Sequence, residues 1–403
     1  MTKTVVLVGA LDTKGEEFAF VRGLIEQAGV KTMTVDFGVM GAPAFAPDVS
    51  RAEVVAAAGG DLAYLASGQH KDAAMATMAN GLAVIVHNLY AEGKLDGILS
   101  MGGSGGTSIA TTAMRVLPVG VPKVMVSTLG GGDVSAFAGA KDITFIPSIV
   151  DVAGINRISR RIYANAAGAI VGMVQTEPPA AQSDKPLLTA SMFGNTTKAV
   201  DQARRRLEAQ GYEVLVFHAT GTGGKTMESL IADGYIVGSL DMTTTELADY
   251  VCGGVLSAGP ERGLAASRAG IPAVLVPGCV DMANFGGMET VPEKYQERTL
   301  YQWNPNITLL RTNVEENRQI GQMIAAAANA ATAPVAVLLP LKGVSMLDSP
   351  GGQFWDPAAD QACYAAIKQT LRPDIPVYEL DYNINDPAFA DQVADTLLAM
   401  LSA

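Results

Sequence analysis

Residues 96–108 read DGILSMGGSGGTS, a short apolar run that enters a glycine-rich turn and then a helical pattern. The free backbone amides of such a turn and the dipole of the following helix converge on one point, which favours an anion. We therefore predict a cradle for a phosphate or carboxylate group in this loop. Its predicted members are Gly103, Ser104, Gly105, Gly106 and Thr107.

The same loop also fits the pattern G-x-S-x-G through Gly102, Ser104 and Gly106. In serine hydrolases a strand, turn and helix of this kind present the nucleophile. The histidines available as its base are His70, His87 and His218. Three interpretations stay open here: an anion cradle, a nucleophilic Ser104 and a purely structural turn.

Similar apolar runs alternate with helical patterns along the whole chain, as in TVVLVG (4–9), PKVMVST (122–128), EVLVFH (213–218) and ITLLRT (307–312). Continuous apolar strands separated by helices are typical of parallel sheets that are covered on both faces. The proline-rich stretch TEPPAAQSDKP (176–186) interrupts this alternation. We predict two doubly wound, Rossmann-like α/β domains with mainly parallel sheets, residues 1–176 and 187–403, and a cleft between them.

Length and charge agree with a soluble two-domain protein. The chain has 403 residues and a net charge of −12, and its three cysteines form no disulfide or metal motif. We therefore expect no binding to nucleic acid or to a membrane by bulk electrostatics, and a reducing, cytoplasmic location. The N-terminal residues lack the pattern of a signal peptide. The uncharged stretch 319–341 fits a buried helix that ends before a strand.

Two more loops of the first domain complete the predicted nucleotide site. GALDTKGEE (9–17) offers Asp12, Thr13 and Lys14, which could hold a phosphate, its bound cation or a ribose. STLGGGD (127–133) adds the hydroxyls of Ser127 and Thr128. The alternative is that both are ordinary turns in which a side chain caps the next helix.

The second domain repeats the pattern of a strand, a glycine-rich turn and a helix in ATGTGGKTME (219–228). A relaxed P-loop, a cradle for a small anion or acyl group, and a structural turn are the alternatives. Asp241 and Asp281 also follow apolar runs, where they could act as general bases, cap helices or bind a cation, and His218 is placed for proton transfer. The predicted substrate-binding residues are Gly221, Thr222, Gly223, Gly224 and Lys225, and the predicted catalytic residues are His218, Asp241 and Asp281.

Taken together, the motifs GALDTKGEE, MGGSGGT, FHATGTGGKTMESLI, PGCVDMANFGG and PLKGVSMLDSPGGQFWDP resemble the Tm-1-like ATP-binding domain family over essentially the whole chain. The resemblance implies two α/β domains, a homodimer, and ATP with Mg²⁺ bound by the N-terminal domain. It carries these roles to Asp12, Thr13, Lys14, Gly103 to Thr107, Ser127 and Thr128. The family motif more often reads GTLDTKG, so Ala10 removes a hydroxyl here.

These observations favour an ATP-dependent metabolic enzyme that acts on a small carboxylate or acyl substrate in the interdomain cleft. A non-catalytic dimer that ATP stabilises for protein binding is the alternative, and a serine hydrolase that uses Ser104 is the third hypothesis. The sequence assigns neither the substrate nor the reaction, and it assigns no metal ligands.

Overall fold

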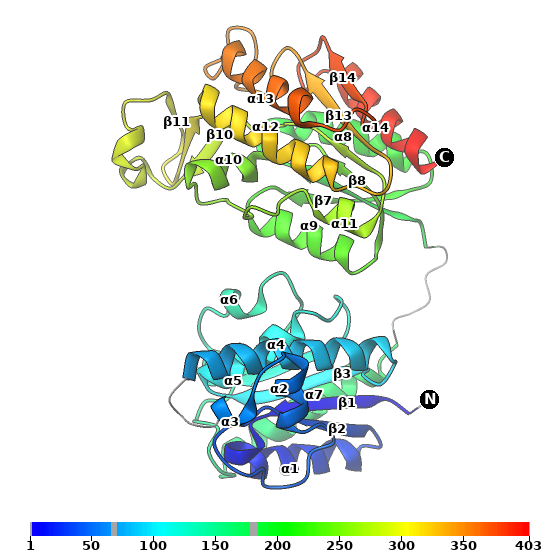
Figure 1. The fold of residues 1–403 in the computed structure, drawn as a ribbon, viewed down its shortest axis with the longest axis vertical. Coiled ribbons are helices and arrows are strands. Elements are labelled where there is room, and N and C mark those ends of the chain that lie inside the picture. The colour runs from blue at the N-terminus through cyan, green and yellow to red at the C-terminus, as the bar shows by residue number, and fades with distance from the viewer. Residues whose placement is uncertain (1, 66–70, 178–183, 403) are drawn as a thin grey trace. The chain divides into compact units, whose positions relative to one another are not determined.

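The computed structural model describes residues 2–65, 71–177 and 184–402 (Figure 1). The chain divides into two compact units, Met1–Ala180 and Ala181–Ala403. The boundary falls within the predicted linker 176–186, of which residues 178–183 lie outside the described part of the chain. His70, one of the histidines considered as a base for Ser104, also lies outside it.

The first unit is a five-stranded parallel sheet with the strand order β2-β1-β3-β4-β5. Its elements are β1 (Thr4–Gly9), α1 (Leu11–Gln27), β2 (Lys31–Asp36), α2 (Arg51–Ala57), α3 (Leu62–Leu65), α4 (Lys71–Ala91), β3 (Gly97–Gly102), α5 (Ser104–Met114), β4 (Lys123–Ser127), α6 (Ser135–Ala138), β5 (Thr144–Pro147) and α7 (Ser159–Gln175).

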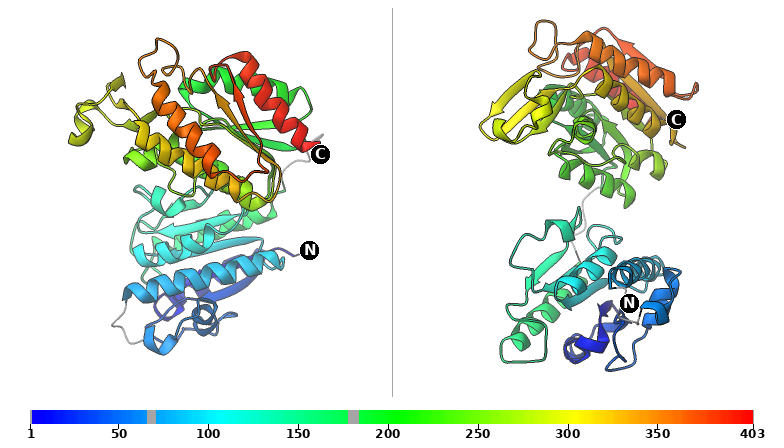
Figure 2. Two further views of the ribbon diagram at one scale, coloured as in Figure 1. Left: turned by 45° about the horizontal axis from the view of Figure 1, so that its top comes forward. Right: turned by 60° about the vertical axis from the view of Figure 1, so that its left-hand side comes forward.

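Alternate residues of β1 enter two different cores, one on each face of the sheet. Val6 and Val8 pack with buried residues of α2, α4 and α5. Val5 and Leu7 pack with buried residues of α1 and α7 on the other face. Figure 2 shows these helices on both sides of the sheet. An unbroken apolar strand is stable in this position because both of its faces are buried.

The second unit contains a six-stranded parallel sheet with the order β14-β13-β9-β8-β6-β7. Its elements are β6 (Leu187–Met192), η1 (Gly194–Thr196), α8 (Thr197–Glu208), β7 (Glu213–His218), α9 (Thr222–Ala232), β8 (Ile236–Asp241), α10 (Thr245–Cys252), α11 (Ala265–Ala269), β9 (Ala273–Leu275), β10 (Met282–Phe285), η2 (Met288–Thr290), η3 (Glu293–Tyr295), β11 (Leu300–Asn304), β12 (Ile307–Arg311), α12 (Val314–Asn329), β13 (Val335–Pro340), α13 (Pro357–Thr370), β14 (Val377–Leu380) and α14 (Pro387–Leu401).

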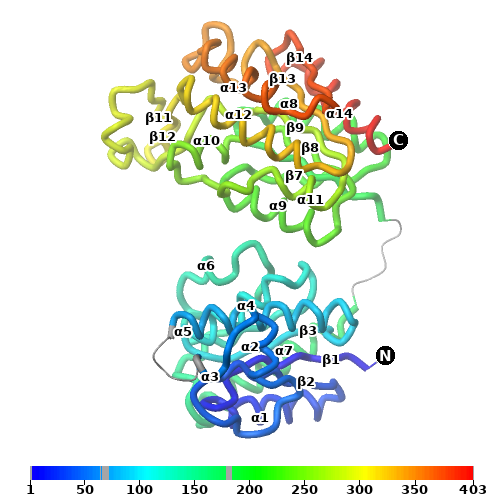
Figure 3. Tube along the Cα trace, in the orientation of Figure 1, coloured from blue at the N-terminus to red at the C-terminus, as the bar shows by residue number. Residues whose placement is uncertain are grey.

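The prediction of α/β units with mainly parallel sheets is confirmed, and the two units share one topology. Numbered from the start of each unit, both sheets begin with the order 2-1-3-4; β5 follows in the first sheet, and β13 and β14 follow in the second. Helices α8 and α14 pack together beside one face of the second sheet, while α10, α12 and α13 share a core on the other. Figure 3 traces both units along the Cα positions.

The antiparallel sheet in the second unit differs from expectation. The apolar run at residues 307–312 suggested another strand of the parallel sheet, but β12 pairs antiparallel with both β10 and β11. The pattern of a five-residue apolar strand contains no information about the direction of its partner. The run therefore predicted a strand correctly and its sheet wrongly.

The long helix α12 begins where its local sequence favours a start. Asn313 accepts a hydrogen bond from the Glu316 amide, and the Glu316 side chain accepts one from the Asn313 amide, which forms a capping box. The helix ends at Asn329, and β13 starts at Val335, as the uncharged stretch 319–341 indicated. In the part of the chain that is described, every helix is too short or too polar to cross a membrane.

Candidate functional site

A cavity of about 210 Å³ opens at the carboxyl edge of the first sheet. It lies at the end of β1 and β3, which are neighbours in the sheet although β2 separates them in the chain. This is the point where the strand order reverses, and it is where open α/β sheets bind their ligands. The loops after β1, β2 and β3 supply its lining, which comprises Ala10, Asp12, Thr13, Lys14, Phe37, Gly38, Val39, Met40, Met101, Gly102, Gly103, Gly106 and Ile109.

Asp12 connects two of these loops and keeps one oxygen without a partner. Its Oδ2 accepts hydrogen bonds from the amides of Met40 at 2.8 Å and Gly41 at 3.0 Å. Its Oδ1 is buried and has no hydrogen-bond partner among the described residues. An unpaired carboxylate oxygen is costly to bury, and a cation or a hydroxyl donor would satisfy it.

The glycines after β3 are not required by the fold. Gly103 caps α5 without a side-chain hydrogen bond, and its φ of −80° is accessible to any residue. A Cβ built at Gly103, Gly105 or Gly106 would meet its nearest neighbour only at 3.6 to 3.9 Å, which is ordinary contact. Glycine here therefore leaves open space beside the first amides of α5, which have no partner within the helix.

Three hydroxyls of this edge have different surroundings. The Oγ1 of Thr107 lies 2.7 Å from the Oγ of Ser127, and both side chains are buried. Ser127 also accepts a hydrogen bond from the Leu129 amide. These two hydroxyls join the loop after β3 to the loop after β4. Thr128 is exposed, and the Cβ position of Gly103 lies 3.8 Å from its Oγ1.

Asp36, at the end of β2, is a residue that the sequence analysis missed. Its Oδ1 accepts hydrogen bonds from the amides of Leu11 and Gly38, and so it fixes the loops after β1 and β2. Its Oδ2 has no partner among the described residues, and burial raises the pKa of this carboxyl. The signal was an aspartate at the last position of the strand sequence KTMTVD (31–36).

A second, apolar cavity of about 620 Å³ shares Thr13, Phe37, Val39, Met40 and Ile109 with the first. The rest of its lining is Leu65, Ala74, Met75, Met78 and Gly105. Polar groups at the strand ends thus adjoin a flexible, methionine-rich space, which can adapt to a flat or irregular apolar group.

The glycine-rich loop after β7 in the second unit is already occupied by a carboxylate of the protein. The Oε1 of Glu246 accepts hydrogen bonds from the Gly221 amide at 2.6 Å and the Gly224 amide at 3.0 Å. A Cβ at Gly224 would collide with this carboxylate, and one at Gly223 with the His218 carbonyl. Two amides of the expected cradle thus serve a contact within the fold, while a cradle formed by Gly221, Thr222, Gly223, Gly224 and Lys225 stays a prediction.

Asp241, one of the expected bases, belongs to a buried ion network. Arg262 is 2% exposed and donates to both oxygens of Asp241, at 2.5 and 2.7 Å. It also donates to Glu246 at 2.6 Å. The Oγ of Ser191 donates to the same aspartate. Asp241 thus holds a buried cation in place through both of its carboxylate oxygens.

Asp281 belongs to a different buried cluster, with Asp348, Asp360 and Arg311. Ser345 donates to its Oδ2 at 2.8 Å, while its Oδ1 has no partner among the described residues. Burial, and then repulsion from Asp348, raises the pKa of Asp281 to about 7. Asp281 itself is fully buried. The structure therefore does not bring the expected catalytic set His218, Asp241 and Asp281 together as one accessible site.

Among the residues described, Ser104 makes no hydrogen bond to a histidine. Ser104 itself is exposed at the start of α5. His87 lies on α4 and is exposed, and His218 belongs to the second unit, where its ring packs against Phe193. Cys279 is fully buried, and burial raises the pKa of its thiol. The buried Cys279 thiol is therefore poorly suited to act as a nucleophile, and neither His87 nor His218 supplies a hydrogen-bonded base to Ser104.

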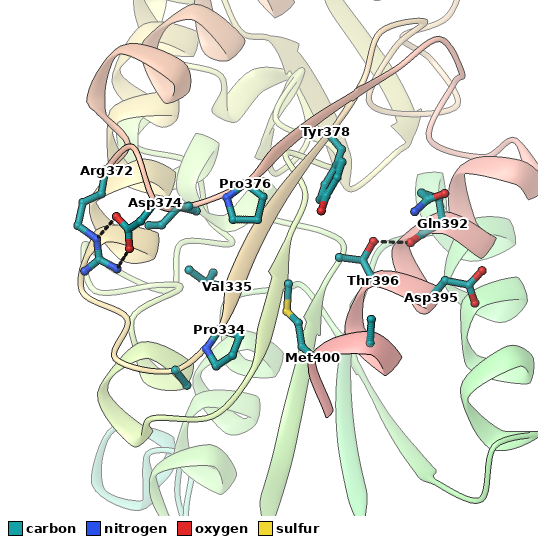
Figure 4. Close-up of a pocket in the computed structure, with 13 residues that line it drawn as sticks. Pro334, Val335, Arg372, Asp374, Pro376, Tyr378, Gln392, Asp395, Thr396 and Met400 are labelled. Carbon is teal, nitrogen blue, oxygen red and sulfur yellow. Dashed lines mark hydrogen bonds and ion pairs between the residues drawn. The ribbon is translucent and has the colours of Figure 1, made fainter. Parts of the chain in front are cut away.

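A groove of about 530 Å³ lies at the amino ends of β13 and β14 (Figure 4). In its lining, Arg372 and Asp374 form an ion pair with each other at 3.2 Å, and the Thr396 hydroxyl donates a hydrogen bond to the Gln392 carbonyl. Ligands of parallel sheets bind at the carboxyl ends instead. We assign no site to this groove.

No described group of three or more histidine, cysteine or acidic residues is arranged to hold a metal.

Comparison with known families matches both units. Residues 3–179 match the Uncharacterised protein family (UPF0261) N-terminal domain, and residues 185–401 match the C-terminal domain of the same family. The chain belongs to the UPF0261 family. The predicted resemblance to Tm-1-like proteins is confirmed by relatives within it.

A UPF0261 protein of Clostridium tetani is 49% identical over 402 residues and covers 100% of both chains. Another from Rhizobium meliloti is 45% identical over 391 residues, 96% of this chain and 97% of the relative. The ToMV resistance protein Tm-1 of Solanum lycopersicum is 41% identical over 332 residues, 81% of this chain but 44% of the tomato protein.

Similarity to solved structures is weak. The UDP-N-acetylglucosamine 2-epimerase of Rickettsia bellii aligns over 100% of the UPF0261 chain and 96% of its own, at 11% identity and a TM-score of 0.24. MurG of Acinetobacter baumannii aligns with a TM-score of 0.22, at 12% identity, over 99% of this chain and 100% of its own. The description of the fold rests on the strand order of this UPF0261 chain itself.

Proposed function

We propose that the first unit binds ATP with Mg²⁺ in the cavity at the carboxyl ends of β1, β2 and β3. One observation carries the proposal: the uncapped start of α5 faces an open cavity through glycines that neither the backbone conformation nor the packing requires. A phosphate group fits such a space, since it can accept hydrogen bonds from the first amides of a helix and is attracted by the helix dipole.

The residues around the cavity suit the charges of a nucleotide. Lys14 lines it and would neutralise part of the phosphate charge. Mg²⁺ retains several waters and commonly takes only one or two protein carboxylates in addition to phosphate oxygens. Asp12, with its unpaired Oδ1, fits that requirement. The bound ion would neutralise the phosphates, and the chain would hold it through this one carboxylate.

The adjoining apolar cavity suits the base of the nucleotide. It shares Thr13 and Phe37 with the polar cavity, so one ligand could extend through both. Methionine side chains contact flat aromatic groups favourably. Ser127 and Thr107, which were expected to bind the ligand, would act by holding the two loops at their present spacing.

The ion pairs of the second unit favour a protein that binds ATP without using it for a reaction on a carboxylate substrate. Asp241 and the amides of Gly221 and Gly224 serve internal contacts, so these three of the groups expected to act on such a substrate have partners within the protein. We propose as a second candidate a homodimer that nucleotide stabilises for binding to another protein. The ATP-dependent enzyme remains a proposal without an assigned catalytic base, and we do not propose the serine hydrolase.

Thermal unfolding with nucleotides tests the proposal. Mg-ATP at about 100 times its dissociation constant should stabilise the protein by roughly 2.7 kcal/mol, because only the folded state binds it. Mg²⁺ alone and uridine should leave the melting temperature unchanged. The absence of a shift with every purine nucleotide would refute the proposal. Phosphate release that depends on an added metabolite would favour the enzyme over the binding module.

A further inference from the structure

The second unit contains a pocket that the buried ion network does not enter. It has a volume of about 240 Å³ and lies over the carboxyl ends of β6 and β7, against the hairpin of β11 and β12. The residues that determine its chemistry are Phe193, Asn195, His218, Trp303 and Leu309. Arg262, Asp241 and Glu246 are absent from its lining. The volume suits a ligand smaller than a typical drug-sized molecule.

The walls of this pocket are aromatic and apolar. The Phe193 ring packs against the His218 ring with a centroid distance of 5.5 Å. Trp303 extends from the edge strand β11 and is 43% exposed, although a tryptophan normally buries most of its large apolar surface. A Cβ at Gly194 would meet the Trp303 ring at 4.0 Å and no nearer atom. A flat ring placed in the pocket would cover aromatic surface that the fold leaves exposed.

One buried polar group in the lining lacks a partner. Asn195 is 2% exposed, and its Nδ2 donates to the Met282 sulfur at 3.4 Å. Its Oδ1 has no hydrogen-bond partner among the described residues. A buried amide oxygen without a donor is costly, and an O–H or N–H group of a ligand would satisfy it.

The pocket has no fixed charge to attract an ion. Its lining within the described residues includes no lysine, arginine, aspartate or glutamate. A carboxylate or phosphate would lose its hydration without gaining a charged partner there. Apart from the His218 imidazole, the lining offers only apolar and neutral polar groups, which favours a neutral ligand.

We propose that this pocket binds a small, neutral, flat ring compound that donates one hydrogen bond, such as a phenol or an N–H heteroaromatic compound. The inference goes beyond the nucleotide site, and it requires no nucleotide to be bound. Asn195 accepts the hydrogen bond, and Trp303 and Phe193 contact the ring.

Fluorine NMR of the full chain labelled with 5-fluorotryptophan tests this site directly. The chain has two tryptophans, Trp303 and Trp355, so Trp303→Phe assigns the two resonances. Phenol should shift the Trp303 resonance saturably, with a dissociation constant of about 1 mM, the range expected for so small a ligand. Trp355 is not part of the lining and should remain unshifted. Toluene, which lacks the donor, and benzoate, which is charged, should each bind at least about fivefold more weakly.

Two variants separate the pocket from unspecific binding. Gly194→Leu should fill the space beside Trp303 and weaken phenol binding at least about tenfold. Gly168→Leu, at a position on α7 where an added Cβ meets no neighbour, is the control and should have no effect. Asn195→Leu should remove the preference for phenol over toluene. Should Asn195→Leu fail to fold, Gly194→Leu still decides. An unshifted Trp303 resonance, or unchanged phenol binding in Gly194→Leu, would overturn the site, and equal affinity for phenol and toluene would overturn the assigned hydrogen bond.

Discussion

Arg262 determines whether a ligand can bind in the second unit at the point where its strand order reverses. The loops that follow β6 and β8 meet there, and the Arg262 guanidinium with its carboxylate partners occupies the space. In the first unit the same position is an open cavity beside Asp12. Two units with one topology therefore differ in whether a protein cation or a ligand can lie at this edge.

Removing Arg262 should destabilise the protein strongly. Arg262→Ala leaves Asp241 and Glu246 buried without their cation, and breaking such a pair typically costs about 3 to 5 kcal/mol. Urea denaturation measures the effect. Arg268→Ala is the control, because Arg268 pairs with Glu261 at the surface, where solvent screens the pair and its loss should leave the stability nearly unchanged. Equal losses for the two variants would contradict a structural role for the network.

Ser104 should contribute a single hydrogen bond to anion binding. Ser104→Ala is expected to weaken Mg-ATP binding by about 1 kcal/mol, because the backbone amides of the loop remain. Calorimetric titration of the variant measures this change. A fluorophosphonate should label neither the wild type nor the variant. Stoichiometric labelling that disappears in Ser104→Ala would instead establish a nucleophilic serine.

The residue types of the first cavity could be predicted from the sequence, but the identity of the buried partners could not. Asp12 and the glycines after β3 follow apolar runs directly, so the parallel topology places them at one edge. Glu246 lies 22 residues from Gly224, to whose amide it is bound, and Arg262 lies 21 from Asp241. Local sequence patterns do not indicate which distant residues pair. A glycine-rich loop whose amides bind a carboxylate of the protein therefore cannot be distinguished by its sequence from a loop that is open to a ligand.

At the level of elements, one buried cluster joins β12, α13 and the loops after β9 and β13. Arg311, at the end of β12, lies 2.8 Å from Asp360 on α13 and 3.7 Å from Asp348. Asp281 completes the set, so three carboxyls share one cation. Burial, and then repulsion from Asp348, raises the pKa of Asp360 to about 8 and that of Asp281 to about 7.

These raised pKa values give the direction of a pH effect on stability. The folded state keeps protons that the unfolded chain releases near pH 4, so the contribution is complete below that pH and is lost as the pH rises through about 7 to 8. We expect the melting temperature to fall between about pH 5 and pH 8. Asp360→Asn, which cannot ionise but can still accept from Arg311, should flatten this dependence. A melting temperature that rises over the same interval would contradict this assignment.

Short strands were the elements whose placement the sequence could not decide. β1 and β3 are apolar on both faces and precede helices, which indicates a parallel sheet. β12 has the same appearance over ITLLR, yet its neighbours β10 and β11 run antiparallel to it. That sheet supplies one wall of the pocket at Trp303, so the pocket could not have been predicted from the sequence either.

At the level of the whole molecule, each unit has its own two-faced core and its own sheet with the same initial strand order. The division of the chain matches the two domains of the UPF0261 family. We propose a nucleotide site in the first unit and a site for a neutral ring compound in the second. Because the two proposed sites lie in different units, each ligand should bind without competing with the other.

The most direct test of the nucleotide site is a calorimetric titration of the full chain with Mg-ATP, carried out on wild type, Gly103→Ala and Gly23→Ala. Both substitutions add one methyl group in unstrained backbone, but only Gly103 lines the cavity. We predict one site per chain in the wild type and in Gly23→Ala, and at least tenfold weaker binding, about 1.4 kcal/mol, in Gly103→Ala with an unchanged melting temperature. Absence of binding heat in the wild type, or equal affinity in all three proteins, would contradict the account.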